Sequence, residues 1–177
     1  MDINKIVQLR LFKHDFKKIL HNSDYSIKYV DYTSYETYLD KLLYISKLMH
    51  KDFEWDGIPT ESNLHNRFKN NSKCFIYYYN NEPVGWTWFH SHVSIDWIST
   101  YQNLNSNELY VGGAYVSKTC NLPAISGFMF YNISFWEWLT EFNYNIIYLY
   151  SDDWNRASAQ LCYKSGFTNY NFLNETN

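Results

Sequence analysis

The segment Asn155-Arg-Ala-Ser158-Ala-Gln-Leu161-Cys-Tyr163-Lys-Ser-Gly166-Phe167 decides the fold of this 177-residue chain. Residues 155–164 predict a helix, and Gly166 is the residue type that ends helices, because it adopts a left-handed backbone without steric cost. The apolar run 146–150 before it predicts a buried strand, and residues 167–173 predict a last strand. The segment therefore closes a strand–helix–strand unit.

Upstream of this unit, a second strand leads into a long helix. Residues 108–116 predict a strand that contains Gly112 and Gly113, and glycines inside a strand usually mark a bulge or a close backbone approach. Residues 121–142 carry apolar side chains at helical spacing, with Asn121 as the expected N-cap and Pro123 in the first turn. Because a helix N-terminus presents free amides and a positive dipole end, the sequence predicts an anion site here.

The first half of the chain adds helices and a hairpin. We expect an edge strand at 6–12 followed by a short amphipathic helix, a strand at 27–32, and a helix at 33–49 that begins with a Thr33-x-x-Glu36 capping box. A weaker helix at 60–69 and a hairpin of 73–79 with 84–92 follow, whereas 94–107 reads as irregular. The order β, α, α, β, β, β, α, β, α, β predicts a mixed α+β fold.

These residues carry a resemblance to a known family. The 155–167 segment is similar to the Asn-x-x-Ala-x-x-Leu-Tyr-x-x-x-Gly-Phe element of the GNAT superfamily of acyl-CoA-dependent N-acetyltransferases, and Ala114-Tyr-Val116 resembles its Leu-x-Val signature. The resemblance covers about 27–173 and implies a central mixed, mostly antiparallel sheet of six to seven strands flanked by helices. It divides the chain into an N-terminal extension, 1–25, and an acetyltransferase domain, 26–177.

The family mechanism implies a role for each motif. An acceptor amine attacks the thioester of acetyl-CoA, which is a co-substrate here, and no metal is implied. The cofactor residues implied are Ala114, Tyr115 and Val116 beside the pantetheine arm and thioester, Asn121, Leu122, Ala124, Ile125 and Ser126 around the pyrophosphate, and Asn155. Tyr163 would protonate the departing thiolate as general acid.

The expected pyrophosphate loop departs from the family pattern Gln/Arg-x-x-Gly-x-Gly/Ala. This chain has Asn121-Leu-Pro-Ala-Ile-Ser126 there, so small residues replace the glycines, Pro123 removes an amide donor and Asn121 removes a charge. The departure motivates a competing hypothesis, in which the domain is a non-catalytic GNAT-like binding module. The short stretch after Phe172 leaves little for the family's seventh strand, so residues 6–12 or a partner subunit would cover that edge.

Several residues are candidates for the catalytic base and for contacts with the acceptor. Strand alternation places Glu108, Tyr110, Gly112 and Ala114 on one face, so Glu108 is a candidate base acting through a water. Asp96, His90, His92 and a chain of waters remain alternatives. Glu54, Trp55 and Asp56 fall in the segment that lines the acceptor site in relatives, and Trp86 and Tyr110 complete the candidate substrate contacts.

Composition and charge limit the function classes. The chain is 46% hydrophobic and 21% aromatic, which excludes a disordered protein, and a net charge of -3 without a basic block disfavours a nucleic-acid partner. No apolar run is long enough for a membrane helix or a signal peptide, so we expect a cytoplasmic protein without a membrane partner. Cys74, Cys120 and Cys162 follow no disulfide or metal pattern.

The leading interpretation is therefore an enzyme that acetylates a primary amine of a small molecule: an amino sugar, a polyamine or an amino acid. Acetylation of a protein lysine or N-terminus is the enzymatic alternative, and the non-catalytic module is the alternative from another class. Whether the chain forms a homodimer remains open.

Overall fold

The computed structural model describes residues 6–19, 24–53, 59–95, 100–152 and 156–173. The chain forms two compact units, one made of Met1–Ile19, His90–Gly112 and Phe135–Asn177, and the other of Leu20–Phe89 and Gly113–Ser134. We call these the first and second unit. The described residues contain four α-helices and a seven-stranded sheet with the strand order β2-β3-β4-β7-β8-β1-β9. The expected mixed α+β fold with a mostly antiparallel sheet is confirmed.

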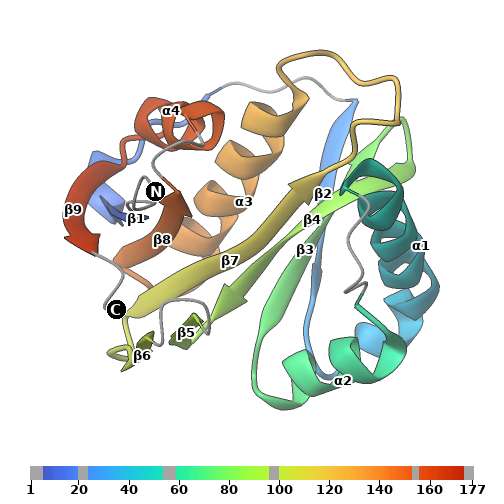
Figure 1. The fold of residues 1–177 in the computed structure, drawn as a ribbon, viewed down its shortest axis with the longest axis horizontal. Helices are drawn as coiled ribbons and strands as arrows, with labels where there is room; N and C mark the ends of the chain where they lie inside the picture. Colours follow the sequence, from blue (N-terminus) through green and yellow to red (C-terminus); the bar gives the residue numbers. More distant parts are fainter. Residues whose placement is uncertain (1–5, 20–23, 54–58, 96–99, 153–155, 174–177) are drawn as a thin grey trace, which may run out of the picture. The chain divides into compact units, whose positions relative to one another are not determined.

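The second unit begins with a helix-covered hairpin. Strands β2 (Tyr25–Val30), β3 (Lys73–Tyr79) and β4 (Glu82–His90) pair antiparallel, and α1 (Tyr35–Phe53) and α2 (Glu61–Lys69) cover one face of them (Figure 1). The turn between β3 and β4 places Asn80 at φ 49° and Asn81 at φ 66°, the left-handed pair that tight hairpins favour. The predicted hairpin and the helix at 60–69 are confirmed.

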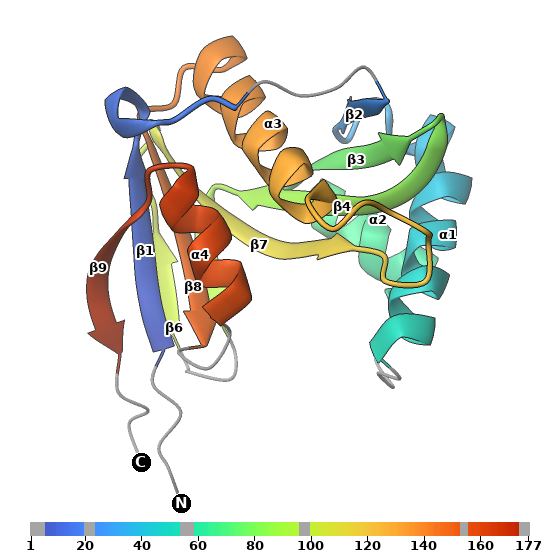
Figure 2. The ribbon, with the colours of Figure 1, turned by 90° about the horizontal axis from the view of Figure 1, so that it is seen from above.

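Two apolar layers lie on opposite faces of this hairpin. One face forms a cluster with α1 and α2 that includes Ile76, Trp86 and Trp88. On the other face Tyr77 stacks on Phe130 of α3 (Ser126–Glu141) at a centroid distance of 4.7 Å. Figure 2 shows the first turns of α3 on this side of β3 and α1 on the other. The alternation of side chains along a strand explains why successive residues serve different layers.

Gly85 lets β4 approach β7 (Glu108–Val116) closely. A Cβ at this position would lie 2.2 Å from the carbonyl oxygen of Tyr115, closer than real Cβ atoms come. Next to this contact, the Ser117 N–H donates to the Val84 carbonyl oxygen at 2.8 Å. The glycine is therefore required for the strand contact that holds the end of β7.

Two helix starts differ from the expectation. The loop before α1 is organised by Asp31, whose Oδ1 accepts the N–H groups of Thr33 and Ser34, so a Thr33–Glu36 capping box is not what begins this helix. The helix α3 starts at Ser126 rather than Asn121, because the Leu122 N–H bonds the Cys120 carbonyl and the Ser126 N–H bonds the Pro123 carbonyl. These local turns replace the predicted first turn of the helix.

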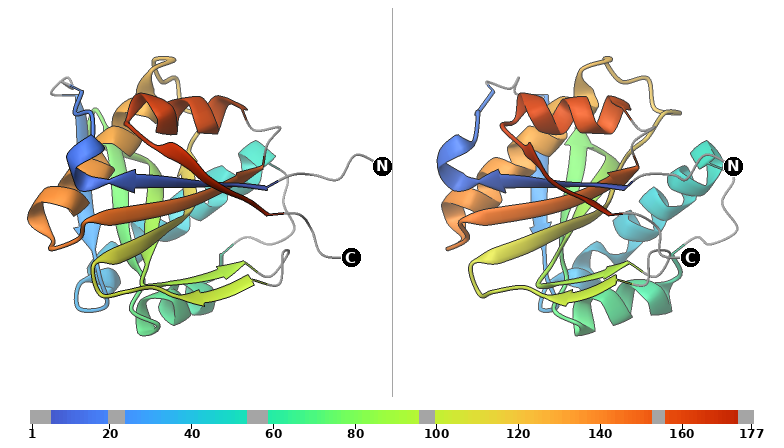
Figure 3. Two further views of the ribbon diagram at one scale, coloured as in Figure 1. Left: turned by 90° about the vertical axis from the view of Figure 1, so that its left-hand side faces the viewer. Right: turned by 60° about the vertical axis from the view of Figure 1, so that its left-hand side comes forward.

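In the first unit the N-terminal strand is an interior strand. Strand β1 (Ile6–Phe12) pairs antiparallel with β8 (Ile146–Asp152) on one side and β9 (Thr168–Leu173) on the other, as Figure 3 shows. The strand itself was predicted correctly, but the expected edge position is wrong. Leu9 and Leu11 of β1 are fully buried, so the strand belongs to the core of this unit. The boundary between residues 25 and 26 stays a prediction.

Two further predictions about the first unit are wrong. After β1 only a 3-10 turn, Lys13–Asp15, replaces the expected amphipathic helix, because the N–H groups of Lys13 and Lys17 bond the carbonyls of Asn145 and Ser165. Residues expected to be irregular form a short hairpin of β5 (His92–Ile95) and β6 (Thr100–Asn103). In contrast, α4 (Arg156–Lys164) ends as predicted, with Gly166 at φ 102°.

No helix among the described residues is long and apolar enough to cross a membrane.

Candidate active site

The end of β7 presents exposed backbone in the second unit. Gly113 has φ 64°, and both Gly113 and Ala114 are exposed, whereas Tyr115 is buried. A strand with small, exposed residues lets a ligand approach its backbone amides. The family resemblance implies that Ala114, Tyr115 and Val116 lie beside the pantetheine arm and the thioester, and the exposure of Ala114 is compatible with that prediction.

Asp52, at the end of α1, fixes this part of β7. Its Oδ2 accepts the hydroxyl of Tyr115 at 2.7 Å, the hydroxyl of Ser117 at 3.2 Å and the N–H of Lys118 at 2.5 Å. Burial alone raises the pKa of Asp52, but these hydrogen bonds outweigh it and hold the pKa below its usual value. We call Asp52, Tyr115, Ser117 and Lys118 the Asp52 network.

The same network orders the turn that follows the strand. The Ser117 Oγ accepts the N–H groups of Thr119 and Cys120 at 3.2 and 3.3 Å. This turn leads into the segment 121–126, where the sequence predicts the pyrophosphate. Asp52 carries no recognisable motif, and its partners lie 63 to 66 residues away in sequence, so sequence reasoning missed it.

The start of α3 has part of what an anion needs. Its first turn holds no acidic residue, and amides at a helix start lack intrahelical acceptors. However, the N–H groups of Leu122 and Ser126 already bond backbone carbonyls, and the buried Ser126 hydroxyl lies 3.1 Å from the Tyr25 hydroxyl. Asn121, Ala124 and Ile125 are exposed. The first turn of α3 therefore offers fewer free donors than the sequence predicts.

The predicted general acid lies in the first unit. Tyr163, on α4, is 41% exposed, and its hydroxyl donates to the Asn169 Oδ1 at 2.5 Å. Asn169, on β9, was not predicted, because nothing in the sequence links these two positions. The hydroxyl must leave Asn169 before it donates a proton elsewhere. Asn155, the other predicted cofactor contact of this segment, lies outside the described residues.

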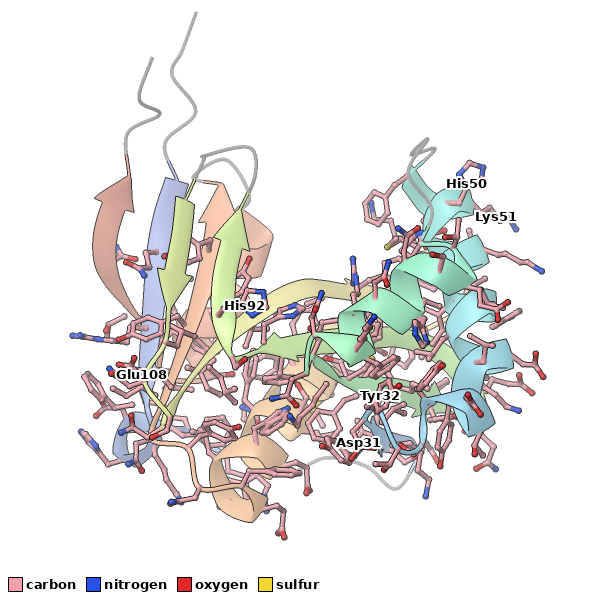
Figure 4. The ribbon with its side chains drawn as sticks, turned by 90° about the horizontal axis from the view of Figure 1, so that it is seen from below. Asp31, Tyr32, His50, Lys51, His92 and Glu108 are labelled. Carbon is pink, nitrogen blue, oxygen red and sulfur yellow. The ribbon has the colours of Figure 1, made fainter. Side chains whose placement is uncertain are left out.

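Glu108, the predicted base, is held at the start of β7 (Figure 4). Its Oε2 accepts the backbone and side-chain N–H groups of Asn105 at 2.9 and 2.8 Å, and its Oε1 accepts the Tyr148 hydroxyl at 3.1 Å. Glu108 lies four residues before Gly112 along the strand, a distance of about 13 Å at the usual rise of 3.3 Å per residue. The structure thus gives Glu108 a bracing role at the far end of the strand.

Titratable rings of the first unit lie closer to Gly112 than Glu108 does. The His90 Nε2 lies 3.3 Å from where a Cβ of residue 112 would be, and the His90 and Tyr110 ring centroids are 5.7 Å apart. The ring centroids of His92 and His90 are 6.2 Å apart. Burial and the neighbouring Tyr150 raise the pKa of Tyr110 to about 12, so this hydroxyl stays protonated at neutral pH. Of the described alternatives to Glu108, His90 borders Gly112.

Of the predicted substrate contacts, one lies in the core and others lie outside the described residues. Trp86 is 1% exposed and belongs to the core cluster under α1 and α2, and its role as a substrate contact stays a prediction. Glu54, Trp55, Asp56 and Asp96 lie outside the described residues. In the parts of the chain that the structure describes, no group of three His, Cys, Asp or Glu side chains is arranged to hold a metal.

Comparison with solved structures identifies the fold. A GCN5-related N-acetyltransferase from Kribbella flavida aligns over 96% of this chain with a TM-score of 0.58 and 10% identity. A tandem GNAT protein from the clavulanic acid biosynthesis pathway aligns over 97% with a TM-score of 0.60 and 10% identity. The chain has the GNAT fold.

Another similar structure is an aminoglycoside acetyltransferase from an uncultured soil metagenomic sample, with a TM-score of 0.55, 14% identity, and coverage of 81% of this chain and 88% of the other. By contrast, this chain spans 56% of the Kribbella flavida chain and 52% of the tandem protein. No protein-family model matches the sequence, and no curated protein matches it. At these identities the GNAT likeness establishes the fold.

Proposed function

We propose that this chain transfers an acetyl group from acetyl-CoA to a primary amine of a small molecule. The observation that carries the proposal is the exposed Gly113–Ala114 segment of β7, followed by an ordered turn and the start of α3, in a chain with the GNAT fold. Solved acetyltransferases with this fold, including one that acts on aminoglycosides, support the reaction class and a small amine as acceptor.

In the proposed reaction the acceptor nitrogen forms a bond to the thioester carbonyl carbon, the carbon–sulfur bond breaks, and the thiolate takes up a proton. The N–H near Ala114 would polarise the carbonyl, a role that preorganised amides serve in acyl transfer. The amides of 121–126 would hold the pyrophosphate, with Asn155 as a further contact, and Tyr163 would donate the proton to sulfur. His90 replaces Glu108 as the favoured base, because both Glu108 oxygens are occupied.

Calorimetric titration with acetyl-CoA and with coenzyme A tests the proposal at its first step. We expect micromolar binding, and release of coenzyme A in a screen of primary amines. Tyr163→Phe should lower kcat by about 10²–10⁴-fold if the hydroxyl is the general acid. Asn169→Ala is the matched variant, because it frees the Tyr163 hydroxyl without removing it and should leave kcat within a few fold. Equal losses in the two variants would contradict the assignment to Tyr163.

One observation favours a non-catalytic module instead. Pro123 lacks an N–H, and the N–H groups of Leu122 and Ser126 are bonded within the loop, so the pyrophosphate segment has lost three donors. No binding at millimolar coenzyme A would make this second candidate the better one. Micromolar binding without turnover of any amine would support binding of the nucleotide alone.

A further inference from the structure

Arg67 is a partly buried cation without an acidic partner among the described residues. It lies on α2, and its Cζ is 5.0 Å from the ring centroid of Trp88. Burial lowers the pKa of Arg67, although Cys74 opposes this, and a guanidinium stays charged at any physiological pH. Burying an unpaired charge is unfavourable, so its presence calls for an explanation.

A second unsatisfied donor lies beside it. Trp88 is fully buried, and its indole Nε1 has no hydrogen-bond partner in the described part of the chain. Buried polar groups without partners are uncommon, and each is expected to have a specific reason. Neither donor has an acceptor among the described residues, and such a pair of neighbouring donors is suited to an acceptor that a ligand supplies.

Both donors border the same position on β7. A Cβ at Gly113 would lie 3.5 Å from the Trp88 Cδ1 and 3.6 Å from the Arg67 Nη1. Since Cδ1 is bonded to Nε1, the donor-bearing edge of the indole is the one that borders Gly113. Gly113 is exposed and has no side chain, so a ligand reaches this position from solvent. All three residues belong to the second unit.

The chemistry of the two donors selects the ligand. A guanidinium forms two parallel hydrogen bonds with a carboxylate, and an indole N–H donates one more. The next step rests on the proposed function, which places the reacting amine near Ala114, the next residue along β7. We propose that Arg67 and the Trp88 indole N–H bind a carboxylate carried by the acceptor. The acceptor is therefore an amino acid, or another amine with a carboxylate a few bonds from its nitrogen.

The acyl group is the other source of a carboxylate at this position, as in a dicarboxylic acyl-CoA. Both sources share the same chemistry at Arg67, and the acyl source predicts a different substrate preference. Comparing acetyl-CoA with succinyl-CoA, each with a neutral amine and with an amino acid, distinguishes them.

The test uses the full chain with acetyl-CoA, the common L-amino acids and their matched carboxamides, following coenzyme A release. The wild type should prefer acids over amides by about 10- to 150-fold in kcat/KM, the ratio that corresponds to one hydrogen bond to a charged group. Arg67→Met should erase this preference through KM with kcat nearly unchanged. Trp88→Phe should reduce it about 2- to 10-fold. Lys69→Met, the same charge change on the exposed face of α2, should leave it intact.

Binding without acetyl-CoA separates this proposal from the proposed function. Calorimetric titration with the best amino acid should give heat in the wild type and none in Arg67→Met, whether or not any acetyl transfer is found. Arg67→Lys keeps the charge but loses the planar pair of guanidinium donors, so it should bind the amino acid more weakly than the wild type does. This variant tests the proposal even if Arg67→Met unfolds.

Equal use of acids and amides by the wild type would overturn the proposal while leaving acetyl transfer standing. Equal losses for acids and amides in Arg67→Met would also overturn it. An Arg67-dependent preference for succinyl-CoA over acetyl-CoA, with neutral amines accepted as well as acids, would overturn the assignment of the carboxylate to the acceptor.

Discussion

The second unit contains two polar sites that differ in how well their hydrogen-bonding capacity is met. In the Asp52 network one carboxylate oxygen accepts three donors from the end of β7 and the turn after it. At Arg67 two donors face Gly113, and the described residues offer no acceptor. The bonds to the Asp52 Oδ2 fix backbone geometry, even though the buried Oδ1 has no partner among the described residues, whereas donors without an acceptor are suited to a ligand that comes and goes. The difference separates the part of the site that holds its shape from the part that selects the reactant.

The largest effect is expected from removing the carboxylate. Asp52→Ala leaves the hydroxyls of Tyr115 and Ser117 and the Lys118 N–H without their acceptor, and should cost about 2–4 kcal/mol of unfolding free energy. Urea denaturation measures this loss. Asp40→Ala, an exposed carboxylate on the same helix, is the control and should change the unfolding free energy by less than about 0.5 kcal/mol. A loss below about 1 kcal/mol for Asp52→Ala would contradict the bracing role.

The sequence predicts local elements far better than these two sites. Strands β1, β3 and β7 match the predicted ranges, because alternating apolar runs and turn residues specify them locally. The start of α3 was missed, because hydrogen bonds within 120–126 compete with the helix. Asp52 and Arg67 act through residues on other elements, so their roles depend on tertiary contacts that no local pattern encodes.

The candidate site shows the same division. Gly113 was singled out as a glycine inside a strand, and Ala114 through the resemblance to the GNAT superfamily; both are exposed. The burial of Trp86 in the core cluster could not be predicted, because an aromatic strand residue has no local signal for which face of the sheet it joins. Glu108 shares the predicted face, but alternation gives a face and not the hydrogen bonds that occupy a carboxylate.

The acid limb of stability provides a second test of the Asp52 network. Because the folded pKa of Asp52 is lowered, its stabilisation is present above the unfolded pKa of about 3.9 and is lost as pH falls through the folded value. Asp52→Asn keeps an acceptor for the three donors but does not titrate. The difference in unfolding free energy between wild type and Asp52→Asn should shrink from pH 7 to pH 3.

Asp31 also has a lowered pKa, because hydrogen bonds from Thr33 and Ser34 outweigh its burial. The wild type and Asp52→Asn should therefore both lose some stability in acid, and only the difference between their unfolding free energies reports on Asp52. A difference that is constant between pH 7 and pH 3 would show that the charge of Asp52 contributes nothing to the network.

A smaller effect is expected at Ser117, which relays the network into the turn. Ser117→Ala removes one donor to Asp52 and the acceptor for the Thr119 and Cys120 N–H groups, and should cost about 1–2 kcal/mol. If the turn positions the pyrophosphate segment, the variant should also bind coenzyme A more weakly in calorimetry. Ser62→Ala, exposed on α2, should change neither quantity. A lower unfolding free energy with an unchanged affinity for coenzyme A would show that the Asp52 network does not position the pyrophosphate segment.

The smallest effect on stability is expected at Arg67, and it carries the comparison furthest. Arg67→Met removes a partly buried charge that has no acidic partner among the described residues and keeps an apolar stem over Trp88, so the unfolding free energy should change by less than about 0.5 kcal/mol or rise. Thermal denaturation with a saturating amino acid should then raise the melting temperature of the wild type and leave that of Arg67→Met unchanged, because only a bound ligand stabilises the folded state in this way. A loss of 2 kcal/mol or more without ligand would mean that Arg67 braces the fold as Asp52 does, and the contrast between the two sites would disappear.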